Sequence, residues 1–185
     1  MIRLQLILSL FVLVLFSACG GSDDASTAEQ EAQSEVSALP ASLARGTTQL
    51  NLEEYFMPFS LYVPDSNRGI PKIVETSYGE TEIQVGKTFH IVVAEGGDLA
   101  TTKSAIAEDL MYTVEIIEEG TDYILYKSSI KDSHLDPEFH FHAVKNVKGT
   151  DFEFHDFNNE GGYAESVARF MLESINHIIP NNSAS

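Results

Sequence analysis

Residues 138–157 read EFHFHAVKNVKGTDFEFHDF, a pattern typical of a β-hairpin. Apolar and polar residues alternate on both sides of Lys148-Gly149, and such alternation predicts two β-strands. A connection of two residues that includes Gly predicts an antiparallel hairpin in which Val147 pairs with Thr150. One face of this hairpin then carries Phe139, Phe141, Ala143, Phe152 and Phe154.

The segment 163–178 predicts a helix that covers this apolar face. Its apolar residues recur three and four positions apart, which gathers them on one side of an α-helix. Because an antiparallel sheet buries its apolar side, we expect Phe170 and Met171 to sit at the centre of this contact. The stripe consists of Tyr163, Val167, Phe170, Met171, Ile175 and Ile178.

Upstream, an inserted helix and several further hairpins are predicted. Asp98 is a suitable N-cap for a helix that ends near Met111, with Leu99, Ile106 and Leu110 near one stripe. Hairpins interrupted by one helix and closed by another predict an α+β fold, an antiparallel β-sheet packed by both helices, as a single domain over residues 50–180. The remaining strands are predicted at 59–63, 72–77, 81–85, 88–94, 112–117 and 123–130.

This order of elements resembles the Mog1/PsbP/DcrB-like group over residues 50–178. The early strand that ends in Phe59-Ser60-Leu61-Tyr62-Val63-Pro64, the central helix, the antiparallel strands and the long terminal helix carry the resemblance. Members include photosystem accessory proteins, a small-GTPase-binding protein and bacterial envelope lipoproteins. The resemblance implies mostly non-enzymatic binding or assembly. It transfers no residue role, because element order contains no motif to match.

The N-terminus resembles a bacterial lipoprotein signal over residues 1–18. Arg3 precedes an 11-residue apolar run, 6–16, interrupted only by Ser9, which is too short to span a membrane and typical of a signal-peptide h-region. The small residues Ser17-Ala18 then precede Cys19, the only cysteine of the chain. The resemblance implies that Cys19 is acylated and becomes the mature N-terminus. The alternative is a secreted protein that is cleaved near Ala18 and keeps a thiol.

Lipidation would place the chain at the cell membrane or outer membrane, facing the periplasm or the cell surface. Two or three acyl chains anchor a protein stably, without a transmembrane helix. Residues 19–49 are expected to form the lipidated end and a disordered acidic tether, because the stretch 20–46 has no aromatic residue and few large aliphatic ones. A short helix over 25–36 is the alternative that its Ala and Glu content allows.

Charge and cysteine content exclude several classes of protein. The 185 residues include 28 Asp and Glu against 11 Lys and Arg, a formal net charge of −17. Such a surface argues against a nucleic acid partner, since binding to phosphates depends on cationic side chains. One cysteine excludes an intramolecular disulfide and a zinc site built from several cysteines.

The histidines of the hairpin are the candidate site. In the predicted register His140 and His142 share a face and His155 lies opposite His142, an arrangement that can bind zinc or copper. The alternative is a polar, solvent-exposed strand face that coordinates nothing. The preceding loop, with Asp132, His134 and nearby polar residues, does not define a triad by sequence proximity alone.

The sequence therefore predicts a lipid-anchored envelope protein with a non-catalytic binding or assembly domain, whose partner is an envelope protein or a small ligand. No catalytic residue is assigned. The competing interpretation is a metal-binding protein or metal-dependent enzyme that uses His140, His142 and His155.

Overall fold

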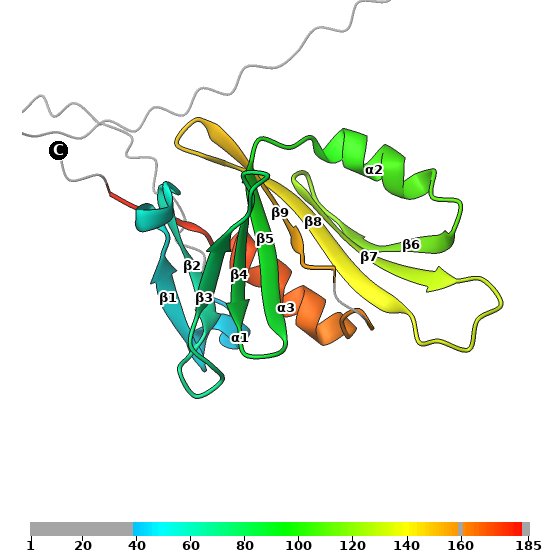
Figure 1. Cartoon of the computed structure of the whole chain (residues 1–185), viewed down its shortest axis with the longest axis horizontal. Helices are drawn as coiled ribbons and strands as arrows, with labels where there is room; N and C mark the ends of the chain where they lie inside the picture. The colour runs from blue at the N-terminus through cyan, green and yellow to red at the C-terminus, as the bar shows by residue number, and fades with distance from the viewer. Residues whose placement is uncertain (1–38, 159–160, 183–185) are drawn as a thin grey trace, which may run out of the picture. The chain divides into compact units, whose positions relative to one another are not determined.

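The structure is a computed structural model that describes residues 39–158 and 161–182 (Figure 1). The predicted signal peptide, Cys19 and most of the predicted tether lie outside the described residues. Within the described ranges no helix is long and apolar enough to cross a membrane.

Most described strands belong to one antiparallel sheet of seven, in the order β3-β4-β5-β9-β8-β7-β6. This arrangement, with the C-terminal helix packed on the sheet, confirms the predicted α+β class. The strands are β3 (Lys72–Glu75), β4 (Thr81–Val85), β5 (Phe89–Glu95), β6 (Tyr112–Glu119), β7 (Tyr123–Ile130), β8 (Glu138–Val147) and β9 (Thr150–Asp156).

A second sheet of three strands, β1-β2-β10, was not predicted, although its central strand β2 corresponds to the strand predicted at 59–63. Its strands are β1 (Thr47–Asn51), β2 (Phe59–Pro64) and β10 (Ile179–Pro180), and a 3-10 helix, η1 (Glu53–Tyr55), links the first two. The first strand is mostly polar and the last has two residues, so neither shows an apolar alternation.

The folded region begins before the expected start at residue 50. Residues 41–49, placed in the tether by sequence, form a short helix α1 (Ala41–Ala44) and most of β1. Leu43 is 1% exposed and belongs to the buried interior, and Ser42 donates a hydrogen bond to Glu173. The prediction of a tether up to residue 49 was therefore wrong for these nine residues, because one buried leucine and strand pairing order a polar stretch.

The β8–β9 hairpin has the predicted register. Val147 pairs with Thr150, and His142 pairs with His155. Lys148 and Gly149 both have positive φ angles, 54° and 88°, as a tight hairpin turn requires. The alternation of the sequence is thus preserved in space, with aromatic side chains on one face and histidines on the other.

The aromatic face packs against the terminal helix α3 (Glu165–Asn176), as predicted, and also against β2. The ring centroid of Phe59 lies 5.1 Å from that of Phe152 and 5.7 Å from that of Phe154. From α3, the buried residues are Ala168, Met171, Leu172, Ser174 and Ile175.

Two details of α3 differ from prediction. The helix begins at Glu165 instead of Tyr163, because Gly162 has a φ of +60° and Ala164 is extended. Phe170 is half-buried, with its ring centroid 5.9 Å from that of Phe89, so of the two residues expected at the centre only Met171 is fully buried.

The inserted helix α2 (Leu99–Ala107) lies across the other face of the sheet (Figure 1). Asp98 is its N-cap, as predicted, and accepts the N–H of Ala100 at 3.0 Å. The helix ends four residues before the expected Met111, because the Asp109 carboxylate accepts the N–H groups of Met111 and Tyr112 and starts a turn. Leu110, predicted on its apolar stripe, is 99% exposed.

Candidate functional site

A cavity of about 610 Å³ lies between α2 and the face of the sheet opposite to α3. None of the nine residues of α2, all of them described, is buried, so the helix is a roof over this space and contributes little to the core. At the start of the roof, Gly97 is required: a Cβ on it would lie 2.7 Å from Cβ of Glu153. The sheet contributes to the lining, among others, Tyr126, Ser128, His140, His142, Glu153 and Asp156.

All three histidines singled out by sequence line this cavity. The rings of His142 and His155 are parallel, with centroids 6.0 Å apart and an interplanar angle of 4°. The Nδ1–H of His155 donates to the carbonyl oxygen of Asp156 at 2.9 Å. The alternative of a solvent-exposed face is wrong at His142, which is 7% exposed because α2 covers it.

His140 is held at both ring nitrogens. Its Nδ1 donates to Oδ2 of Asp156 at 2.8 Å, and its Nε2 lies 3.1 Å from Oγ of Ser128. The carboxylate of Asp156 is itself fixed, since Oδ1 accepts the backbone N–H of Phe141 at 2.8 Å. Burial alone would lower the pKa of His140, but the hydrogen bond and charge of Asp156, with the charge of Glu138, raise it above 6.5.

His142 connects the sheet to the roof. Its Nε2 lies 2.9 Å from Oε1 of Glu153 and 3.3 Å from Oγ1 of Thr102 in α2. The Thr102 hydroxyl donates to the carbonyl of Asp98, so it accepts from His142. Burial lowers the pKa of His142 below 6.5, and Glu153 only partly opposes this effect.

These hydrogen bonds bear on the metal hypothesis. In residues 39–158 and 161–182, no group of three or more His, Cys, Asp or Glu side chains is arranged to hold a metal ion. Ring nitrogens of His140, His142 and His155 are engaged with carboxylates, hydroxyls or a carbonyl group. Binding of zinc or copper by these three residues stays a prediction from sequence.

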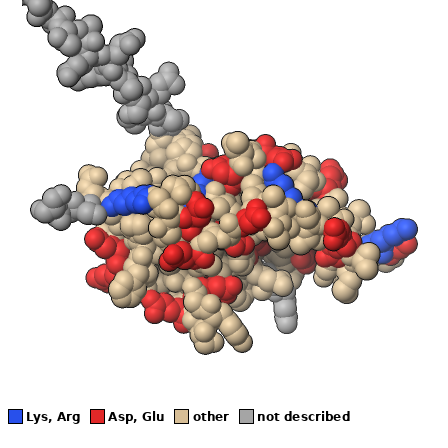
Figure 2. Space-filling model, turned by 90° about the horizontal axis from the view of Figure 1, so that it is seen from above, with Lys and Arg blue, Asp and Glu red and all other residues tan. Residues whose placement is uncertain are grey.

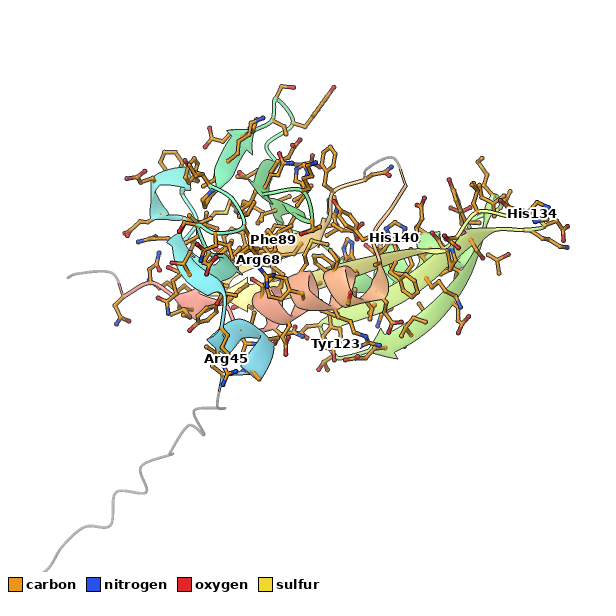
Figure 3. The ribbon with its side chains drawn as sticks, turned by 90° about the horizontal axis from the view of Figure 1, so that it is seen from below. Arg45, Arg68, Phe89, Tyr123, His134 and His140 are labelled. Atoms are coloured by element: carbon orange, nitrogen blue, oxygen red, sulfur yellow. The ribbon has the colours of Figure 1, made fainter. Side chains whose placement is uncertain are left out.

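The loop cluster at 132–136 is not brought to the cavity. His134 lies near the tip of the β7–β8 loop, well away from His140 on the sheet (Figure 3).

A second compartment of about 380 Å³, lined mostly by apolar residues and also by the Lys103–Glu119 ion pair, continues the cavity along α2 and β6. The two share Ile106, Asp109, Tyr112 and Val114 in their linings. The second compartment adds Ile116 and Ile124. The site therefore has a polar end at the histidines and an apolar end toward the edge strand.

The polar end has an excess of negative charge. Four carboxylates line it, those of Asp109, Glu138, Glu153 and Asp156, and its described lining includes neither Lys nor Arg. Two of the four pair with His140 and His142 at 2.8 and 2.9 Å, and Glu138 lies 3.7 Å from the same His140 ring, so four carboxylates face only two of these histidines. The wider surface is similar, with many Asp and Glu side chains and few Lys and Arg on the face seen in Figure 2.

Sequence reasoning missed Tyr126, Ser128, Asp156 and the α2 contact of Thr102. Alternation within the predicted strand 123–130 already placed Tyr126 and Ser128 on one face. It could not show that β7 pairs with β8, where Tyr126 is opposite His140. Alternation puts Asp156 on the same side as Phe152 and Phe154, but as the last residue of β9 its carboxylate accepts the N–H of Phe141 and bonds to His140.

Comparison with known proteins adds no family assignment. No protein-family model matches this chain, and no curated protein sequence matches it.

Proposed function

We propose that this chain is a lipid-anchored cell-envelope protein whose folded domain binds a small ligand in the cavity between α2 and the seven-stranded sheet. The cavity itself carries the proposal: its volume is in the range of about 300 to 1,000 Å³ usual for small-molecule sites, and convergent polar groups adjoin an apolar compartment. The resemblance to the Mog1/PsbP/DcrB-like group, with its binding and assembly proteins, supports the same role.

The charge of the lining favours a ligand with a positive group. Asp109 and Glu138 attract a cation, and the rings of Tyr112 and Tyr126 can contact it through their faces. An anion placed among four carboxylates would be repelled. A wholly apolar ligand would desolvate these carboxylates without replacing their hydrogen bonds to water.

The apolar compartment favours a hydrocarbon or aromatic portion on the same molecule. Ile106, Val114, Ile116 and Ile124 provide the contact surface. The ligand class that fits the whole site is an amphiphilic amine whose ammonium group lies at the polar end.

Displacement of the neutral dye Nile red tests the proposal. The full chain with Cys19→Ser, which lacks the acylation residue, is titrated with the dye. We expect a fluorescence increase that hexylammonium reverses at a concentration about tenfold lower than hexanoate does. Ala105→Trp, which fills the cavity from α2, should abolish the increase, whereas the matched control Ala100→Trp, on the same helix but outside the lining, should keep it.

Two results would overturn parts of the proposal. Equal dye binding by Ala105→Trp and Ala100→Trp would show that the cavity is not the site. Equal or better displacement by hexanoate would show that the ligand is not cationic. A histidine-dependent response to Zn²⁺ or Cu²⁺ in place of the amine would favour the metal-binding alternative.

The proposed lipid anchor in the cell membrane or outer membrane is tested separately. Cells are labelled with alkyne palmitate. We expect label on the natural chain and none on Cys19→Ser. Equal label on both proteins would remove acylation from the proposal and leave the ligand site unaffected.

A further inference from the structure

Three polar residues in the cavity have the connectivity of a hydrolytic triad. Oγ of Ser128 lies 3.1 Å from Nε2 of His140, and Nδ1 of His140 donates to Oδ2 of Asp156 at 2.8 Å. A triad requires this order of atoms: the nucleophile on one ring nitrogen and the orienting carboxylate on the other. Three neighbouring strands, β7, β8 and β9, supply one residue each.

The orienting carboxylate is firmly placed. The Asp156 side chain is 5% exposed, and its second oxygen accepts the backbone N–H of Phe141, so it holds the His140 ring in one orientation. The bond from Nδ1–H to Asp156 leaves Nε2 as the atom that can take a proton from Ser128. All three residues line the cavity.

We infer that Ser128 is the nucleophile, His140 the general base and Asp156 the orienting acid of an esterase site within the ligand cavity. The inference rests on the proposed function, since the cavity must admit the ester. It departs from the expectation of a non-catalytic domain. The substrate class is a carboxylic ester that carries the ammonium group of the proposed ligand and whose apolar part lies in the compartment of Ile106 and Val114.

The reaction is a balanced hydrolysis. Oγ of Ser128 attacks the ester carbonyl carbon while its proton passes to Nε2 of His140. The C–O bond to the alcohol breaks and His140 returns the proton to the departing oxygen, which leaves an acyl group on Ser128. Water, deprotonated by the same nitrogen, then releases the acid and restores the serine.

Tyr126 also lines the cavity beside the proposed nucleophile. It lies two residues before Ser128 on the same face of β7, with its ring centroid 5.2 Å from that of His140. Burial and the charges of Asp156 and Asp109 raise the pKa of its phenol, so the hydroxyl stays protonated and can donate a hydrogen bond.

An alkyl fluorophosphonate, which modifies activated serines, tests the inference on the full Cys19→Ser chain. We expect one adduct per molecule, mapped to Ser128 by peptide mass spectrometry. Hydrolysis of p-nitrophenyl butyrate should fall about a thousandfold in Ser128→Ala and in His140→Gln. Ser129→Ala should keep both reactions, because that hydroxyl contacts the carbonyl of Thr113 on the neighbouring strand.

The pH profile separates catalysis from a structural role. His140 must be neutral to accept the proton, and Asp156, Glu138 and Tyr126 face it from its own and neighbouring strands. The labelling rate should therefore rise with pH through a midpoint above 6.5, and Glu138→Gln should move that midpoint down.

The outcomes distinguish this inference from the proposed function. Nile red binding without labelling or hydrolysis would overturn the triad and leave the ligand site standing. Labelling of equal rate in Ser128→Ala and the parent chain would also overturn it. Labelling that is lost in Ala105→Trp but kept in Ala100→Trp would support both the ligand site and the triad. A parent chain that neither binds the dye nor is labelled would overturn both.

Discussion

The two faces of the β8–β9 hairpin carry out different tasks with the same backbone. On one face Phe141 is 1% exposed and packs in the common core with α3. On the other, His140 and His142 meet carboxylates and a helix that buries none of its nine described residues. The difference lies in what each cover contributes: α3 closes its face with apolar contact, and α2 encloses a cavity.

This comparison indicates where stability and binding are located. Apolar contact between α3 and the sheet supplies much of the free energy of folding, because burial of apolar area is its main favourable contribution. The helix α2 that covers the cavity is held by polar contacts. Thr102 is hydrogen-bonded to His142, and Lys103 pairs with Glu119 at 2.6 Å. Polar ties of partly exposed groups contribute little to stability and permit opening.

The largest expected effect lies on the core face. Met171 is 0% exposed, so Met171→Ala should lower the free energy of unfolding by about 2 to 5 kcal/mol. Leu110→Ala, at a residue 99% exposed just beyond α2, is the matched control and should change it by less than about 0.5 kcal/mol. Urea denaturation measures both. Similar losses from the two changes would contradict the assignment of the faces.

Sequence patterning predicted the core face better than the cavity face. The period of alternation fixed the hairpin register and the aromatic side, since a slip of one residue would expose every phenylalanine. The three- and four-residue spacing of the terminal helix also placed Met171 correctly in the core. The prediction put Phe170 too close to the centre of the contact. Helical spacing shows which side of the helix is apolar, but it does not show where the edge of the sheet lies.

The cavity face could not be predicted to the same depth. Its key contacts join residues far apart in the chain, such as Thr102 with His142 and Ser128 with His140. Polar residues on a strand have no periodic signal that tells a covered face from an exposed one. Strand order in the sheet, which sets β7 beside β8, depends on tertiary packing instead of local sequence.

A smaller loss is expected when a carboxylate on the cavity side is neutralised. Asp156→Asn removes the charge that pairs with His140 and should cost about 1 to 3 kcal/mol, since the site is 5% exposed. Glu82→Gln is the matched control in the same sheet: Glu82 pairs with His90 at 3.3 Å and is 28% exposed. Its loss should be under about 1 kcal/mol by thermal denaturation. A larger loss from Glu82→Gln than from Asp156→Asn would contradict the expectation that the buried carboxylate contributes more to stability.

The pH dependence of stability should separate His140 from His142. The raised pKa of His140 gives stability that is complete below pH 6.5 and is lost as pH rises through the pKa of the folded state. The lowered pKa of His142 gives the opposite sign, with stability present above pH 6.5 and lost as pH falls below it. His140→Gln should therefore flatten the alkaline side of the profile and His142→Gln the acidic side.

Urea midpoints measured between pH 5 and 9 give this profile. The carboxylates that oppose or support these shifts are Asp156 and Glu138 for His140, and Glu153 and Asp156 for His142. The same flattening by both variants would show that the two imidazoles titrate as one group.

Thr102→Val is expected to have the smallest effect on global stability but a clear effect on the local opening of α2. The change keeps the shape of the side chain and removes the hydroxyl that lies 3.3 Å from His142. Because none of the described residues of α2 is buried, the free energy of unfolding should fall by less than about 1 kcal/mol. Amide hydrogen exchange within α2 should nevertheless quicken several-fold, since local opening needs only the tie to be lost. Ser104→Ala is the control, because its hydroxyl bonds the carbonyl of Ala100 inside the helix. If exchange quickens equally in both variants, the helix opens by fraying of its own turns, and the contact with His142 does not hold the roof.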